Sequence, residues 1–302
     1  MNSSQLYASA MFASRNPALA EKSQFGALLR AAESACAPLP LPYYFTCTTS
    51  GGVSRGKQIE QREELLRPWL RSTTCELHNT SLDPYAHTGW EVSAQVTFLR
   101  NPVSYRRPSV ENFLQSVSLS RSIGPGDTAR LLGGVKELFR LLDAPSGYIH
   151  VATDQTLVQG ELGFTSMGPA RPLLERKADG AAGPAVDLDW LNWKHPEDTN
   201  DRIEQLALVR SQVGPRLRGT YWGTFLGREL VDELGGESRI AREAPVAVVE
   251  SLDGGGMYLQ LTPSPEPITT PVMQRGLVAL ERFLEPVLVP TPLYFATRNF
   301  DS

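Results

Sequence analysis

The chain has 302 residues, of which 41% are hydrophobic and 21% charged, a composition typical of a globular protein with a full hydrophobic core. Lysine and arginine number 29 against 33 aspartate and glutamate residues, and the resulting formal charge of −4 argues against a general nucleic-acid-binding protein. The N-terminus lacks the basic and apolar regions of a signal peptide, and no apolar run reaches the length of a membrane-spanning helix. We therefore expect a cytoplasmic protein without membrane contact.

The first half of the chain shows two helical and two strand patterns. A helix is expected after Asn16 and Pro17, and a second over residues 59–70. Residues 90–99 alternate apolar and polar side chains, which predicts a strand with one buried face, and residues 113–121 predict another strand. The apolar residues at helical spacing in the first helix are Phe25, Leu28, Leu29 and Ala32.

The next segment predicts a helix capped by Asp127, followed by a short strand over residues 148–151. Gly133 and Gly134 lie inside this helix and weaken it by roughly 1 kcal/mol each, so tertiary packing has to hold it. Its apolar stripe comprises Leu131, Val135, Leu138 and Leu142.

Residues 169–196 are rich in proline, glycine and charge and predict a long irregular excursion, followed by a helix over 198–213. Residues 246–250 and 257–261 flank a glycine-rich turn and predict a hairpin. Thr270-Pro271 begins a last helix, with Met273, Leu277, Leu280 and Leu284 on one side. Helices and antiparallel pairs without regular β-α-β alternation predict an α+β fold, with mostly antiparallel sheets packed against helices.

Residues 51–57 satisfy the pattern G-x-x-x-x-G-K of a phosphate-binding loop, and a nucleotide-dependent or hydrolytic enzyme is therefore an alternative. However, the residue after Lys57 is Gln58, which offers no hydroxyl to Mg²⁺. The preceding segment also lacks the continuous aliphatic character of a strand buried on both faces. The favoured interpretation is a flexible glycine loop.

No other pattern predicts a catalytic residue, a metal site or a cofactor. The histidines share no metal-ligand spacing, and each is expected to be a surface or partly buried polar residue: His78, His87, His150 and His195. No G-x-S-x-G segment is present. Three cysteines without C-x-x-C spacing predict neither a disulfide framework nor a zinc site: Cys36, Cys47 and Cys75.

Two segments carry opposite charge. Residues 100–140 hold seven basic and three acidic residues, whereas residues 185–205 hold six acidic and two basic ones. Two tryptophans, residue types enriched in binding hot spots, lie among the carboxylates of the second segment. Such a surface complements a basic partner, for example the substrate cleft of a nuclease; the alternative is that both indoles dock the excursion onto its own domain. The candidate partner-binding residues are Asp187, Asp189, Trp190, Trp193, Glu197, Asp198 and Asp201.

Residues 217–226, with the sequence LRGTYWGTFL, resemble the signature segment of the type VI secretion immunity family, formerly a domain of unknown function. The likeness continues through residues 229–236, the hairpin and the last helix, and in general layout extends from about residue 88 onward. The signature residues are Tyr221, Trp222, Gly223, Phe225, Leu226, Gly235 and Gly236. Physically, their aromatic and aliphatic members indicate a buried strand running into a turn, and their glycines indicate special backbone positions.

The resemblance implies a cytoplasmic α+β protein, encoded beside an antibacterial effector, that binds and neutralises this toxin without a cofactor or catalytic residue. A nuclease is one such toxin. An adaptor that delivers the effector remains a further alternative. We expect residues 86–302 to form the immunity-family domain and residues 1–85 to form an N-terminal segment of separate role, unless the two are one continuous domain.

Overall fold

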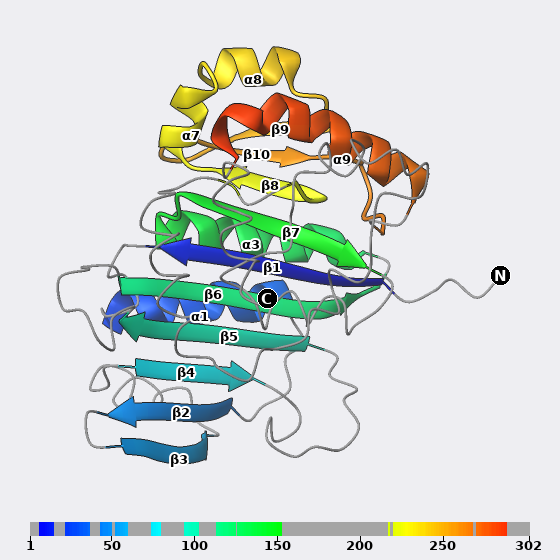
Figure 1. Cartoon of the computed structure of the whole chain (residues 1–302). Coiled ribbons are helices and arrows are strands. Elements are labelled where there is room, and N and C mark those ends of the chain that lie inside the picture. The colour runs from blue at the N-terminus through cyan, green and yellow to red at the C-terminus, as the bar shows by residue number, and fades with distance from the viewer. Residues whose placement is uncertain are drawn as a thin grey trace, which may run out of the picture. The chain divides into compact units, whose positions relative to one another are not determined.

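The computed structural model describes residues 6–14, 22–36, 43–49, 52–59, 74–79, 94–102, 113–124, 126–152, 217, 220–267 and 270–288. These residues fall into two compact units, Met1–Ala144 and Pro145–Ser302. Each unit combines an antiparallel sheet with helices, so the α+β fold expected from the sequence is confirmed (Figure 1). The domain boundary expected between residues 85 and 86 lies between two neighbouring strands, 74–79 and 94–102, that pair with each other. The separate role of residues 1–85 stays a prediction.

Six antiparallel strands form the sheet of the first unit, in the order β3-β2-β4-β5-β6-β1 (Figure 1). The expected strands at 90–99 and 113–121 correspond to β5, which begins at Ala94 among the described residues, and to β6. Their alternation of apolar and polar residues agrees with a sheet that packs helices on one face. The strands are β1 (Leu6–Ser14), β2 (Tyr43–Thr49), β3 (Gly52–Ile59), β4 (Thr74–Asn79), β5 (Ala94–Pro102) and β6 (Phe113–Ile123).

Two helices, α1 (Lys22–Cys36) and α3 (Asp127–Leu142), pack against each other and against β1, β5 and β6. All eight apolar residues expected on their inner faces are buried. The prediction that Asp127 caps α3 was wrong by one position, because Gly126, with a φ of 84°, is the N-cap residue. Asp127 is the first helical residue, and its Oδ2 accepts a hydrogen bond from the Gly124 backbone N–H at 3.0 Å.

The two glycines of α3 lie in different surroundings. A Cβ on Gly134 would lie 2.6 Å from the Ala35 Cβ and 2.7 Å from the Ala31 carbonyl oxygen, both on α1. Gly133 is exposed, and a Cβ there would have no neighbour within 4 Å. Glycine at position 134 lowers the helix propensity of α3, but it allows α3 to pack closely against α1.

We expect Gly134→Ala to lower the free energy of unfolding by about 1–3 kcal/mol, because α1 and α3 have to move apart. Gly133→Ala is the matched control in the same helix, and its higher helix propensity should raise the free energy of unfolding by about 0.5–1 kcal/mol. Urea denaturation of both variants measures these effects. Equal stabilisation by the two substitutions would contradict the close packing of α1 on α3.

The glycine-rich segment at 51–57 is not a loop that leads into a helix. Its residues from Gly52 onward lie in β3, where Lys57 pairs with Phe45 in the antiparallel ladder with β2. A phosphate-binding loop presents its backbone N–H groups to the phosphates ahead of a helix N-terminus, whereas a strand is extended. Both the loop and the phosphate-site interpretations are therefore wrong for residues 52–57. Ile59 ends β3, and the rest of the helix expected over 59–70 lies outside the described residues.

Four antiparallel strands form the sheet of the second unit, in the order β7-β8-β10-β9. The expected hairpin and last helix are confirmed, while the excursion at 169–196 and the helix at 198–213 lie outside the described residues. The strands are β7 (Ser146–Ala152), β8 (Gly223–Leu226), β9 (Val248–Leu252) and β10 (Gly256–Gln260). The helices are α7 (Arg228–Glu233), α8 (Glu237–Glu243), α9 (Pro271–Leu284) and the 3-10 turn η3 (Glu285–Val287).

Local sequence explains where α9 begins and how it docks. The Thr270 side chain accepts a hydrogen bond from the Met273 N–H at 3.3 Å, and Pro271 occupies the first turn. The four residues of the expected apolar stripe are all buried. A Cβ on Gly276 would lie 3.1 Å from the Leu261 side chain, so the helix packs closely on the segment that follows β10. Within the described residues, no helix is long and apolar enough to cross a membrane.

Candidate partner-binding surface

The signature segment forms the core of the second unit. Tyr221, Trp222, Phe225 and Leu226 are at most 3% exposed, and β8 runs between β7 and β10. The Phe225 ring lies against the Tyr258 ring of β10, with centroids 4.7 Å apart. Tyr258 is fully buried, and this burial raises the pKa of its phenol far above the usual range. These side chains are inaccessible to a partner and act through packing.

Trp222 anchors the segment that follows β10. Its Nε1 donates hydrogen bonds to the Thr262 Oγ1 at 3.0 Å and to the Ser264 carbonyl oxygen at 3.2 Å. Its own carbonyl oxygen accepts a hydrogen bond from the Leu261 N–H at 2.9 Å. Because the indole N–H is satisfied inside the core, the burial of this large side chain carries no unpaired donor.

The signature glycines meet two physical requirements. A Cβ on Gly223 would lie 2.9 Å from the Tyr258 hydroxyl, so glycine at this position leaves room for the Tyr258 ring against β8. Gly235 and Gly236 have φ values of 90° and 88° in the turn between α7 and α8, a region that L side chains rarely adopt. The signature residues thus build the scaffold, and a contact surface has to be sought elsewhere on the unit.

An excess of carboxylates covers the helices and hairpin that follow this core. Between Arg228 and Asp253 the chain has seven carboxylates and three arginines, a formal charge of −4. We name as the acidic cluster its five members Glu229, Asp232, Glu233, Glu237 and Asp253, which are all exposed. Their elements lie together: the Ser251 hydroxyl donates a hydrogen bond to the Glu237 Oε2 at 2.7 Å, and a Cβ on Gly255 would contact the Arg228 side chain.

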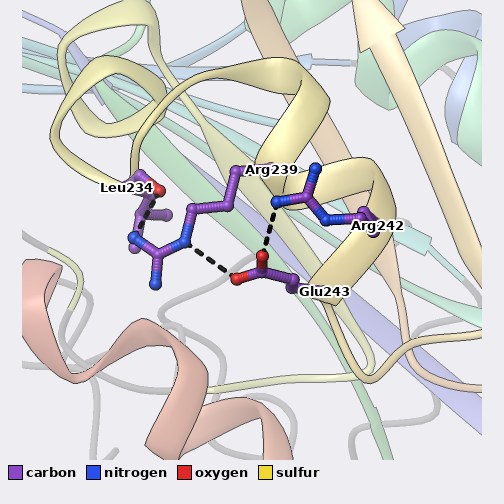
Figure 2. A network of polar contacts seen from close by, with 4 residues as sticks. All are labelled: Leu234, Arg239, Arg242 and Glu243. Carbon is purple, nitrogen blue, oxygen red and sulfur yellow. Dashed lines mark hydrogen bonds and ion pairs between the residues drawn. The ribbon is translucent and has the colours of Figure 1, made fainter.

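The arginines of this region leave most of its negative charge in place. Figure 2 shows that Arg239 and Arg242 both bind one carboxylate, that of Glu243, at 2.9 and 2.7 Å. Arg239 also donates to the Leu234 carbonyl oxygen at the end of α7. Hydrogen bonds from Arg239, then from Arg242, lower the pKa of Glu243, so this carboxylate stays charged. Arg228 lies 3.9 Å from Asp232, and both side chains are largely exposed.

The candidate contact residues expected from the sequence lie outside the described residues: Asp187, Asp189, Trp190, Trp193, Glu197, Asp198 and Asp201. The acidic cluster was missed because its charges are spread over two helices and a hairpin, although the surplus of carboxylates from 228 to 253 is readable in the sequence. Within the described residues, no three histidine, cysteine or acidic side chains are placed to hold a metal ion.

One histidine differs from expectation. His150 in β7 is 1% exposed, so its assignment as a surface or partly buried residue was wrong. Its ring meets the Tyr221 ring edge-on at a centroid distance of 6.1 Å, and Tyr221 stacks on Tyr148 at 4.0 Å. The strand pattern gave no signal for this burial, because a single polar residue in a short apolar segment fits either face.

Residues 200–293 match the model of a family described as type VI immunity for VRR-NUC (TsiV). The matched range contains the signature strand, the acidic cluster and α9. This part of the chain is similar to that family over about a third of the sequence. The resemblance noted from residues 217–236 is therefore confirmed.

The fold of the chain has a counterpart among solved structures. A type VI secretion system protein of Pseudomonas aeruginosa is similar with a TM-score of 0.51 and 11% sequence identity. The similarity covers 97% of this chain and 85% of that protein. At this identity the likeness concerns the fold. No curated protein matches the sequence.

Proposed function

We propose that this protein is an immunity protein that binds a nuclease toxin and blocks it in a stoichiometric complex. The observation that carries the proposal is the match of residues 200–293 to a family described as immunity for VRR-NUC. Binding alone performs this task, so the protein needs neither a catalytic residue nor a cofactor. We place its action in the cytoplasm, where a nuclease would meet the DNA of the producing cell.

The charge of the second unit supports a nuclease as the partner. Nucleases hold phosphates, and their substrate clefts are accordingly basic. The acidic cluster presents exposed carboxylates, and its complement would be such a cleft. Complementary charge acts mainly on the rate of association and loses its effect as salt screens it.

Titration of the purified toxin encoded beside this gene tests the function. We expect nuclease activity to fall linearly with added protein and to vanish at one equivalent, as a tight complex requires. Cells that express the toxin should survive when they also express this protein. Undiminished nuclease activity at a large excess of the protein would overturn the proposal. It would also be overturned if the protein were required for secretion of the toxin but did not protect cells from it.

The double variant Glu229→Lys, Glu233→Lys tests the acidic cluster, because it brings the formal charge of residues 228–253 from −4 to zero. At low salt we expect association with the toxin to slow by about tenfold or more, and at about 0.5 M salt by much less. Stopped-flow fluorescence measures both rates. Glu137→Lys, which reverses one partly exposed glutamate of α3 that pairs with Arg140, is the control and should associate like the wild type. If the control slowed association with the toxin as much, the effect would come from the net charge of the protein and the acidic cluster would not be a docking site.

The carboxylates of the sequence-derived candidate set remain a second proposed contact. Reversing Asp187 and Asp189 to lysine should slow association at low salt by about tenfold if the excursion also faces the toxin. The same stopped-flow measurement distinguishes the two regions, because each variant reverses the charges of one region and leaves the other region unchanged. An unchanged rate for this variant would confine the contact to other surfaces.

A further inference from the structure

Two of the three cysteines occupy opposite positions in the sheet of the first unit. Cys47 in β2 and Cys75 in β4 are direct partners in the antiparallel ladder. Paired positions continue on both sides, with Thr46 opposite Glu76 and Thr48 opposite Thr74. The cysteine pair therefore lies within a continuous ladder, where the register is supported on both sides.

Antiparallel geometry brings such positions within reach of a disulfide. Directly opposite residues have Cα atoms about 4.5 or about 5.5 Å apart, depending on the type of pair. Disulfides span Cα distances of about 4.4–6.8 Å, so both types fall within the allowed range. The third cysteine, Cys36, is buried in α1 and belongs to neither strand.

We propose that Cys47 and Cys75 are a redox-modification site that forms a cross-strand disulfide when the protein meets hydrogen peroxide. One thiolate attacks the peroxide and becomes a sulfenic acid, with release of water after proton transfer. The second thiol attacks this sulfur, the S–S bond forms, and a second water leaves. Both sulfurs are oxidised and one peroxide is reduced, and a thiol reductant reverses the reaction.

The bond has a defined place in the fold. It links β2 directly to β4 and closes the chain over residues 48–74, which include β3. A covalent link of this kind restricts the unfolded chain and so favours the folded state. The stability of this edge of the sheet then depends on the redox state of the protein.

The experiment treats the reduced full-length protein with hydrogen peroxide, unfolds it in the presence of iodoacetamide and counts alkylated thiols by mass spectrometry. We expect two of the three thiols to be protected, and a peptide crosslink between Cys47 and Cys75 that dithiothreitol removes. Cys36→Ser should form the same crosslink. Cys47→Ser should form none.

A register control separates this pair from chance proximity. The double variant Cys75→Ser, Thr74→Cys moves the thiol one position along β4, and neighbouring positions of a strand lie on opposite faces of the sheet. We expect at least a tenfold loss of the crosslink in this variant. Three alkylated thiols in the treated wild type would overturn the proposal, as would a crosslink to Cys36 or an undiminished yield in the register variant.

Discussion

Trp222→Ala should lower the free energy of unfolding by about 3–5 kcal/mol, the range for removal of a large aromatic side chain from a core. The indole is 1% exposed and is the largest fully buried side chain of the described residues. The substitution leaves a cavity beneath the segment that follows β10. It also removes the hydrogen bonds that hold Thr262 and Ser264. Urea denaturation followed by circular dichroism measures the loss.

Trp222→Phe is the matched control, because it keeps an aromatic ring but removes the indole N–H. We expect it to cost less than half as much as the alanine substitution, since most of the buried volume remains. Each of the two variants, as long as it remains folded, should still inhibit the toxin. If Trp222→Ala remained as stable as the wild type but no longer bound the toxin, this tryptophan would be a contact residue and its assignment to the core would be wrong.

Elements with a strong hydrophobic period were predictable from the sequence. The inner faces of α1, α3 and α9 follow from apolar residues at helical spacing, and the hairpin follows from two apolar segments around a glycine-rich turn. In α3, the two glycines also indicated that packing holds the helix. The contact of Gly134 with α1 now supplies the physical reason.

Features that depend on pairing between distant segments were not predictable in this way. The segment 52–57 reads locally as a loop because of its glycines and charges, and its strand structure follows from its ladder with β2. The acidic cluster likewise requires α7, α8 and the hairpin to be brought together. A single sequence contains the charges but does not state which of them become neighbours.

Lowering the pH from 7 to 4 should remove about 3 kcal/mol of stability through His150 alone. Burial lowers the pKa of this imidazole from its ordinary value of 6.5 to about 4. Below pH 6.5 the unfolded chain takes up a proton at this site, whereas the folded chain stays neutral until the pH approaches 4. The unfolded state therefore binds more protons across this window. The free energy of unfolding falls as the pH falls, and the contribution of this histidine levels off only below pH 4, where the folded protein takes up the proton as well.

His150→Gln isolates this contribution, because glutamine does not titrate. The variant is expected to be less stable than the wild type at pH 7, yet the difference between them should shrink steadily from pH 6.5 to pH 4. Urea denaturation at half-unit pH steps measures both curves, and their difference removes the common effect of the carboxylates. Parallel curves for wild type and His150→Gln would mean that the folded protein protonates His150 as readily as the unfolded chain, in conflict with its burial in β7.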